Sequence, residues 1–367
     1  SAEDLIALTN AVEAPRQELF RRLNMAPKGT ANLVALRSDL LKQLRAHPSL
    51  KSTDSDLKHL LSSWFNRGFL QLSRIDWKSP AEILEKLISY EAVHEIHGWD
   101  DLRRRLMKDR RCFAFFHPAM PNEPLIFVEV ALVKGLSDEV TSLIDPDAPE
   151  LNPKQADTAI FYSINNTQSG LRGISFGNFL IKQVLTELTK ECPWIKVSST
   201  LSPIPTFRAT IEQWLTSDEA SPQNNEFDKI LKNNSSSLTP MRSQLAPDEI
   251  QDDKLCLAAL LQSHLNEKDA AIGTILTELA LSFLSFTNNN GMLADPVAMF
   301  HLSNGAYLWR INPYADKSEH GQNNSYGLMV NYLYDLNAVE INHEAFVTKG
   351  EIKMSDELKK LFDKLKR

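Results

Sequence analysis

The sequence has few cysteines and no long apolar run. Its 367 residues include Cys112, Cys192 and Cys256, and no two of them stand at the spacing of metal ligands. We expect these cysteines to be buried thiols in a reducing compartment. No stretch approaches the roughly 18 consecutive apolar residues that a membrane-spanning helix requires. The composition therefore predicts no metal site and no transmembrane segment.

An excess of positive charge is also missing. The formal net charge is -7 at pH 7, and charged residues make up an ordinary 24% of the chain. This balance argues against a general affinity for nucleic acid or for an anionic membrane. Any anionic ligand must therefore meet basic side chains that are gathered locally.

The N-terminus lacks the basic-then-apolar layout of a secretory signal peptide. The sequence thus predicts a soluble, cytoplasmic protein. It begins at Ser1 rather than at methionine, so an organellar targeting segment removed from the N-terminus stays open as an alternative.

The length and the apolar pattern predict two domains. A chain of 367 residues exceeds the size at which a single core usually stops growing, and its 43% apolar content can fill two. Residues 1–91 carry apolar side chains at helical spacing and almost no strand signal, which predicts an all-helical domain. The apolar stripes are Leu5 to Leu23, Leu33 to Leu44, Leu57 to Leu72 and Ile83 to Tyr90.

Short apolar runs rich in Phe, Ile and Val begin beyond Trp99 and predict strands. They are Cys112 to His117, Leu125 to Val133, Thr158 to Ile164, Trp194 to Ser199, Ala306 to Ile311 and Leu328 to Tyr334. Residues 207–290 return to helical spacing, interrupted by a predicted polar loop at 217–225 and 232–237. Ser355 to Lys366 predicts a closing amphipathic helix. Residues 92–367 are therefore expected to form an α+β domain with a helical insertion.

A glycine-bearing segment, Gln168 to Asn178, lies between a predicted strand and a helix predicted at 178–191. A helix start exposes free N–H groups and the positive end of the helix dipole, and glycines let the main chain approach a phosphate. Arg172 can add a charge-assisted contact. The segment has neither a Walker A ending nor the spacing of a dinucleotide-binding motif. An ordinary strand-to-helix turn is the alternative, and the pattern alone favours it.

Two further segments hold side chains suited to proton transfer. Ser202 follows a predicted strand and precedes Pro203, which fixes the local chain path. His301 stands between an apolar segment and the turn residues Asn304 and Gly305, and histidine can act as a general acid near neutral pH. A Ser-Pro turn and a buried, hydrogen-bonded histidine are the alternatives for these residues. The residues alone leave both roles open.

Several short blocks of the sequence follow one another in an order that is typical of one protein family. These blocks are Tyr90 to His94 with Trp99, Arg110 to Phe113, Glu123 to Leu125, Val130 to Leu132, Gly177 to Lys182, Leu201 to Pro205, Asp295 to Ala298, His301-Leu302, Asn304 to Ala306, Leu308 to Asn312 and Asn331-Tyr332. Through them the sequence resembles the malonyl-CoA decarboxylase family across roughly residues 60–335. Thr206 departs from the family pattern, in which glycine usually follows Pro-Ile-Pro.

The resemblance implies an N-terminal helical domain used in oligomer assembly, with a dimer or tetramer expected. It also implies a catalytic domain of the GNAT acyltransferase type at residues 92–367, built on a mixed sheet flanked by helices. Ser202 and His301 match the family's catalytic residues, which also contact the substrate. The loop that matches the coenzyme A-binding residues consists of Arg172, Gly173, Ile174, Ser175, Phe176, Gly177 and Asn178.

The reaction implied by the resemblance is conversion of malonyl-CoA to acetyl-CoA and carbon dioxide. Loss of carbon dioxide leaves electrons on the α-carbon that delocalise onto the thioester oxygen, so the substrate needs no separate cofactor or metal. The resemblance implies that Ser202 hydrogen-bonds and relays a proton at the malonyl group, and that His301 protonates the α-carbon. Which residue handles which proton stays open.

Other functions remain as alternatives. A coenzyme A-dependent acyltransferase on the same fold is the strongest, because acyl-CoA binding alone does not select between transfer and decarboxylation. A serine hydrolase is disfavoured, since no Gly-x-Ser-x-Gly motif surrounds Ser202. A non-catalytic assembly role would rest on the helical domain, but both Ser202 and His301 are present.

Overall fold

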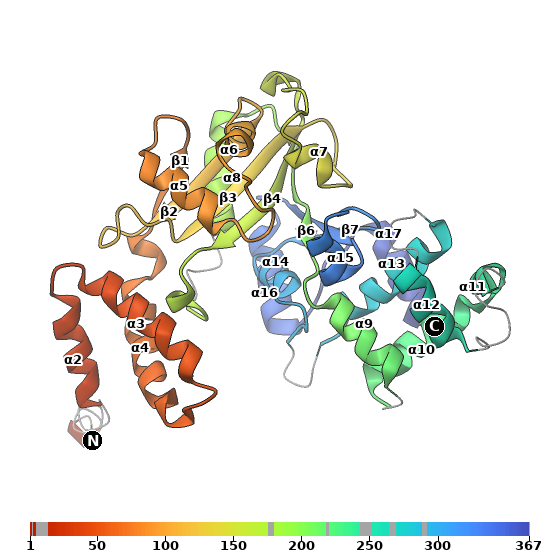
Figure 1. The fold of residues 1–367 in the computed structure, drawn as a ribbon, viewed down its shortest axis with the longest axis horizontal. Coiled ribbons are helices and arrows are strands. Elements are labelled where there is room, and N and C mark those ends of the chain that lie inside the picture. Colours follow the sequence, from red (N-terminus) through yellow and green to blue (C-terminus); the bar gives the residue numbers. More distant parts are fainter. Residues whose placement is uncertain are drawn as a thin grey trace. The chain divides into compact units, whose positions relative to one another are not determined.

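The computed structural model of the chain describes residues 1, 3–4, 14–174, 180–217, 220–242, 252–263, 269–287 and 292–366. It divides into two compact units, whose elements are labelled in Figure 1. Unit 1 comprises residues 1–106, 111–129 and 163–186, and unit 2 comprises residues 107–110, 130–162 and 187–367. The expected domain boundary at residue 91 stays a prediction.

Unit 1 opens with three helices, α2 (Pro15–Asn24), α3 (Gly29–Gln43) and α4 (Lys51–Trp64). They pack around a small apolar core that consists of Phe20, Leu33, Leu57 and Leu60. Pro15 begins α2, a position where the missing N–H of proline costs no helical hydrogen bond. The predicted helices are confirmed here, while Leu5, Leu8 and Val12 of the first stripe lie outside the described residues.

The helix expected over Leu57 to Leu72 is wrong at its C-terminal end. The helix α4 ends at Trp64, and Gln71–Ile75 forms the strand β1, antiparallel to β2 (Arg110–Phe116) with Ile75 opposite Cys112. Within β1 the buried side chain is that of Ile75, so the local sequence carries little strand signal. Pairing with the fully buried β2 decides the conformation instead.

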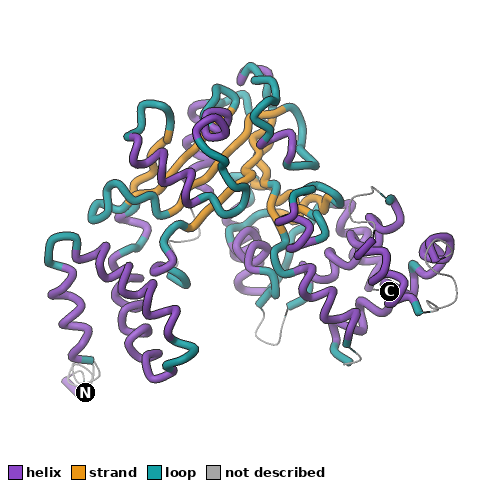
Figure 2. Tube along the Cα trace, viewed as in Figure 1, coloured by secondary structure: helices purple, strands orange, loops and turns teal. Residues whose placement is uncertain are grey.

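The described residues contain one mixed sheet, drawn in orange in Figure 2. Its further strands are β3 (Ile126–Val133), β4 (Thr158–Asn166), β5 (Val197–Thr200), β6 (Ser202–Pro203), β7 (Tyr307–Asn312) and β8 (Met329–Tyr334). The strand order is β1-β2-β3-β4-β5-β8-β6, and β7 pairs with β8. The pair β4–β5 is parallel, whereas β5, β6 and β7 are antiparallel to β8. The α+β class is thus confirmed, although β5 starts at Val197 rather than at the expected Trp194.

The Tyr90 to His94 block in unit 1 contains a buried carboxylate, that of Glu91. This block follows α5 (Ala81–Tyr90), and the Glu91 carboxylate accepts hydrogen bonds from the main-chain N–H groups of Val93 and His94. It also accepts hydrogen bonds from Ser163 Oγ at 2.8 Å and Asn165 Nδ2 at 2.9 Å. Several donors compensate the carboxylate for its lost hydration. The block therefore ties the end of α5 to β4.

The helical insertion is confirmed, and it contains more helix than expected. Its helices are α9 (Phe207–Thr216), α10 (Pro222–Asn233), α11 (Ser235–Arg242), α12 (Asp253–Ser263) and α13 (Ala270–Ser285). The loop expected at 217–225 and 232–237 is wrong for the residues within α10 and α11. Ser221 caps α10 by accepting a hydrogen bond from Asn224 N at 3.0 Å. Residues 222–225, 232–233 and 235–237 of the expected loop therefore lie within helices.

The remaining elements complete the two units. They are α6 (Trp99–Arg105), α7 (Thr141–Ile144), α8 (Leu180–Glu191), α14 (Pro296–Ser303), α15 (Glu319–Ser325), α16 (Val339–Lys349) and α17 (Asp356–Lys366). Cys112, Cys192 and Cys256 are buried, as expected, and form no disulfide. No helix within the described ranges has the length and apolar character needed to cross a membrane.

Candidate active site

Ser202 and His301 lie in hydrogen-bond contact in unit 2. The distance from Ser202 Oγ to His301 Nε2 is 2.9 Å. Both side chains are buried, with 6% of Ser202 and 2% of His301 exposed. Tertiary structure thus joins two residues that local sequence leaves unlinked, in an environment where electrostatic interactions are strong.

Pairing with β8 fixes the position of Ser202. Ser199 of β5 lies opposite Leu333 of β8, and Ser202 of β6 lies opposite Val330, so β5 and β6 follow one continuous register. The parallel pairing of β4 with β5 reaches only Thr200. Ser202 therefore stands just beyond the carboxyl end of β5, the edge where α/β proteins commonly place reactive groups.

The short helix α14 carries His301 in its last turn. Asp295 caps this helix, since its carboxylate accepts hydrogen bonds from Val297 N at 2.9 Å and Ala298 N at 2.8 Å. Pro296 occupies the first helical turn, where proline is favoured. The Asp-Pro pair in the sequence is therefore a helix-start signal that places His301.

Thr206, the departure from the family pattern, contacts this cap. Its hydroxyl donates a hydrogen bond to Asp295 Oδ2 at 3.2 Å. Burial raises the pKa of Asp295, and the hydrogen bonds from Ala298, Thr206 and Val297 oppose that rise. Thr206 thus helps to stabilise the carboxylate that starts the histidine-bearing helix.

Two tyrosines of β8 hold the imidazole from its other sides. Tyr334 Oη lies 2.8 Å from His301 Nδ1. The Tyr332 ring stacks on the imidazole with ring centroids 4.5 Å apart and an interplanar angle of 24°. These tyrosines share one face of β8 because side chains alternate along a strand. Tyr332 belongs to a block that resembles the family, whereas Tyr334 has only the pattern of a core residue in a strand. Neither signal in the sequence predicts a contact with His301.

The imidazole and the two tyrosines are neutral at physiological pH. Burial lowers the pKa of His301 to about 3, so its imidazole is uncharged. Burial also raises the pKa values of Tyr332 and Tyr334 well above their ordinary range. The protonated Tyr334 hydroxyl can donate to Nδ1, and then Nε2 carries the hydrogen and donates to Ser202. The opposite tautomer makes Nε2 the acceptor of the Ser202 hydrogen.

The expected coenzyme A loop is described in part. Arg172 and Gly173 are exposed and Ile174 is buried, whereas Ser175, Phe176, Gly177 and Asn178 lie outside the described residues. Gly173 has a φ of +75°, a conformation that favours glycine. The assignment of this loop to coenzyme A stays a prediction.

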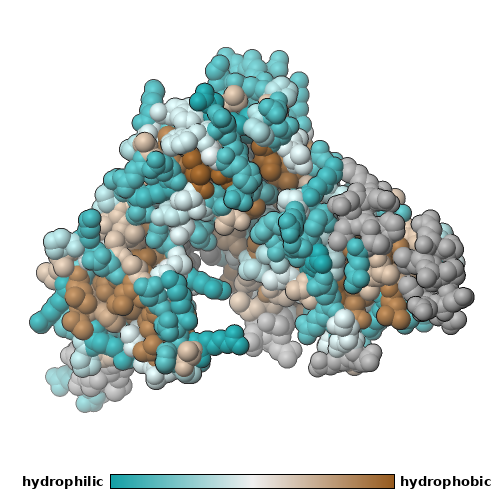
Figure 3. Space-filling view, viewed as in Figure 1, coloured by the Kyte–Doolittle hydropathy of each residue, from teal (hydrophilic) through white to brown (hydrophobic). Residues whose placement is uncertain are grey.

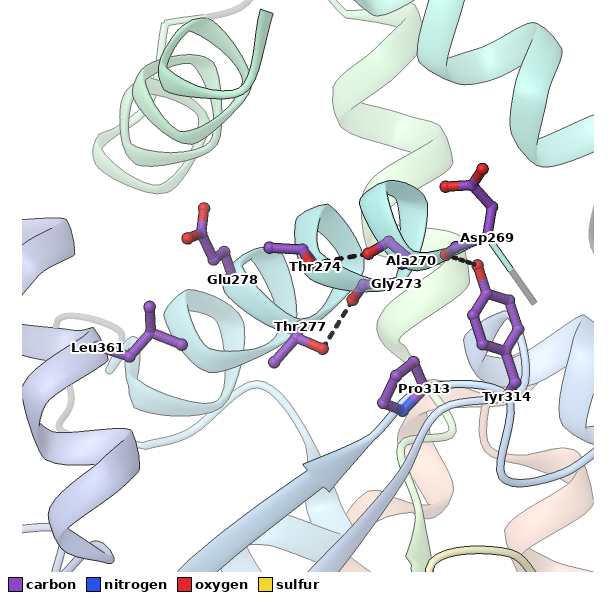
Figure 4. A pocket seen from close by; sticks show the side chains of 9 residues that line it. All are labelled: Asp269, Ala270, Gly273, Thr274, Thr277, Glu278, Pro313, Tyr314 and Leu361. Carbon is purple, nitrogen blue, oxygen red and sulfur yellow. Dashed lines mark hydrogen bonds between the residues drawn. The ribbon is translucent and has the colours of Figure 1, made fainter. Parts of the chain in front are cut away.

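A separate pocket of about 340 Å³ lies along α13 in unit 2 (Figure 4). Its lining residues are Asp269, Ala270, Gly273, Thr274, Thr277, Glu278, Pro313, Tyr314 and Leu361. The two threonine hydroxyls that line it donate to carbonyls of their own helix, at 2.8 Å and 2.7 Å, and the Tyr314 hydroxyl donates to Asp269 O. The pocket therefore offers few free polar groups to orient a ligand.

The buried imidazole links protonation to stability. Unfolded histidine titrates near pH 6.5, whereas folded His301 titrates near 3, so the unfolded state binds more protons between these values. The free energy of unfolding should therefore fall as pH decreases through this window. We predict that His301→Gln weakens this fall by about 1 kcal/mol per pH unit below pH 6. Urea unfolding at pH 7, 6 and 5 measures it, and equal pH dependence in both proteins would contradict it.

Two family models match the chain. That of the malonyl-CoA decarboxylase N-terminal domain matches residues 1–65, and that of the malonyl-CoA decarboxylase C-terminal domain matches residues 68–367. Malonyl-CoA decarboxylase, mitochondrial, of Anser anser anser is 38% identical over 348 residues, which cover 93% of this chain and 68% of the relative. The protein of the same name from Rattus norvegicus is 36% identical over 347 residues, covering 93% and 69%.

Solved structures agree with these matches. The crystal structure of malonyl-CoA decarboxylase from Rhodopseudomonas palustris is 45% identical with a TM-score of 0.85, covering 98% of this chain and 82% of that one. That from Agrobacterium vitis is 44% identical with a TM-score of 0.79, covering 98% and 83%. Sequence and fold are thus similar over nearly the full length. The chain belongs to the malonyl-CoA decarboxylase family.

Proposed function

We propose that this chain converts malonyl-CoA to acetyl-CoA and carbon dioxide with Ser202 and His301 as its catalytic residues. Family membership over nearly the full length supports the reaction. The observation that carries the assignment of residues is the 2.9 Å hydrogen bond between Ser202 Oγ and His301 Nε2 inside the protein. A buried hydroxyl that is bonded to an imidazole can both orient a substrate and pass a proton.

The decarboxylation step transfers no group between substrate and protein and only moves an electron pair within the substrate. The bond between the carboxylate and the α-carbon breaks, carbon dioxide leaves, and the pair spreads over the α-carbon and the thioester oxygen. Only 6% of Ser202 and 2% of His301 are exposed, which indicates a site with little water. Poor hydration of the substrate carboxylate favours its loss as neutral carbon dioxide. A hydrogen bond from the Ser202 hydroxyl stabilises the charge that develops on the substrate.

Protonation of the α-carbon completes the reaction. Burial keeps His301 neutral without substrate, and the anionic malonyl group favours its imidazolium form, so one proton enters from solvent with the substrate. The imidazolium passes its Nε2 proton to Ser202 Oγ as Ser202 gives its own proton to the α-carbon. His301 is left as the neutral imidazole from which the cycle began.

The remote part of the substrate supplies binding energy. We assign the loop from Arg172 to Asn178 to coenzyme A, with the exposed Arg172 as a cation for a phosphate group. Contacts with the coenzyme A part supply binding energy that does not depend on the reacting malonyl group. Coenzyme A is part of the substrate, so no separate cofactor belongs to the proposal.

A first experiment tests the reaction and the role of the histidine together. Incubation with malonyl-CoA and no acyl acceptor should release carbon dioxide in equal amount to acetyl-CoA, whereas an acyltransferase would need an acceptor. His301→Ala should lower kcat by about 10² to 10⁴, with a much smaller change in coenzyme A affinity. Near-normal turnover of that variant would remove His301 from the mechanism.

A second experiment tests the tyrosine that contacts the imidazole. Tyr334→Phe removes the hydroxyl that lies 2.8 Å from His301 Nδ1 and should lower kcat about tenfold, since the tautomer loses its partner. Tyr332→Phe is the matched control, because the Tyr332 hydroxyl has no hydrogen-bond partner among the described residues. Its kcat should stay within about twofold of the parent. Equal losses in both variants would point to packing rather than to the hydrogen bond.

We further propose that the protein forms a homo-oligomer through its N-terminal helices. Apolar side chains are exposed on the N-terminal helices, including Leu19 at 53%, Leu23 at 44% and Leu36 at 47%, and Met25 after α2 is 85% exposed. Figure 3 shows apolar surface over these helices. A homo-oligomer formed through this surface would cover these apolar side chains. For its location, we propose the cytoplasm.

The oligomer has its own measurement. Light scattering should give the parent a molar mass of a dimer or tetramer. Leu19→Lys combined with Leu23→Lys should lower that mass, because two charges would be buried in the interface. A monomeric parent, or an unchanged mass in the double variant, would contradict assembly through this surface.

A further inference from the structure

The N-terminal helices hold the main chain of the glycine-bearing loop in unit 1. Arg37 of α3 is 2% exposed, and its Nη1 donates to Gly170 O at 2.7 Å and to Arg172 O at 3.0 Å. Its Nε donates to Asp54 of α4 at 2.8 Å. One buried guanidinium therefore joins α3, α4 and the loop, and its charge is balanced by the Asp54 carboxylate.

The loop also packs closely on α3. A Cβ atom placed on Gly170 would lie 1.9 Å from the main-chain oxygen of Val34, so this approach requires glycine. Ser38 Oγ lies 2.6 Å from Ser169 Oγ. These contacts leave the exposed residues Arg172 and Gly173 at a set position beside α4.

A lysine of α4 stands next to this exposed part of the loop. The ammonium of Lys58 lies 3.5 Å from the position that a Cβ of Gly173 would occupy. Lys58 is exposed, and its ammonium has no acidic partner within the part of the chain that the structure describes. A cation from the helical domain thus flanks the glycine that follows Arg172, on a chain whose net charge is -7.

Charge and shape at this point suit a phosphate. Glycine leaves its main chain accessible, and the ammonium supplies a compact positive charge with rotatable donors. In a chain with excess negative charge, two exposed cations beside such a glycine form a local exception. The malonyl group has no phosphate, whereas the coenzyme A part of the proposed substrate carries several.

We propose that Lys58 binds a phosphate group of coenzyme A, and that Arg37 is the positioning residue that holds Arg172 and Gly173 beside Lys58. This inference rests on the proposed function of the loop. The N-terminal helices then take part in substrate binding as well as in assembly.

Lys58→Gln in the full chain tests the proposal. The KM for malonyl-CoA and the Kd for coenzyme A should rise about 3- to 10-fold, the range expected for one lost charge-assisted contact. The kcat should change less than about twofold, because a remote contact is equal in ground state and transition state. With malonyl-pantetheine, which lacks the phosphates, kcat/KM should be the same in variant and parent.

Lys51→Gln is the matched control, because Lys51 is an exposed lysine at the start of the same helix. Its KM and Kd should stay within about twofold of the parent values. Parent-like KM and Kd in Lys58→Gln would overturn the inference while decarboxylation by the parent upheld the proposed function. An equal loss with malonyl-pantetheine would also overturn it, since the effect would not involve a phosphate. A coenzyme A Kd that depends on Lys58 without any decarboxylation would support the inference and reject the proposed reaction.

Discussion

Antiparallel pairing along β8 is the constraint on which the site depends. The strand pairs with β5 and β6 and also with β7, so its path is fixed by hydrogen bonds on both edges. Asn331, which is fully buried, donates to Thr200 O at 2.8 Å and accepts from Asn312 Nδ2 at 2.9 Å. Because side chains alternate along a strand, the neighbouring Tyr332 and Tyr334 face the histidine. A shift of one residue in this pairing would turn both tyrosines away from it.

Burial gives these groups their chemical state. His301 is neutral because desolvation disfavours its charged form, and its ring nitrogens meet hydroxyl groups at both ends. The tyrosines stay protonated for the same reason. Ser202, His301 and Tyr334 thus form a row of neutral hydrogen-bonding groups in the protein interior. A hydrogen bond there stabilises a developing negative charge more than it would in water. That property suits a reaction whose substrate accepts its own electrons.

Unit 1 contains two buried arginines that bind carboxylates and main-chain carbonyls. Arg105 of α6 donates to Asp101 at 3.1 Å and to Glu129 at 2.9 Å, and it also donates to His94 O at 3.0 Å. Burial raises the pKa of Glu129 to about 7 in spite of this guanidinium. Arg37 acts in the same way at the loop, where a buried arginine binds main-chain carbonyls. Arginine suits both places because its planar group presents several donors at once.

Local signals in the sequence determined most helices, the buried strands and the family. The Asp295-Pro296 pair marks the start of the histidine-bearing helix, and apolar runs such as Leu125 to Val133 predict strands that are buried on both faces. The same signals failed at β1 and at 232–237, where tertiary pairing and helix packing override a weak or polar pattern. Tertiary structure alone decided that Ser202, His301 and Tyr334 meet and that Arg37 reaches the loop. These partners are far apart in the chain, and the patterns within a short segment record its own burial but not the identity of its distant neighbours.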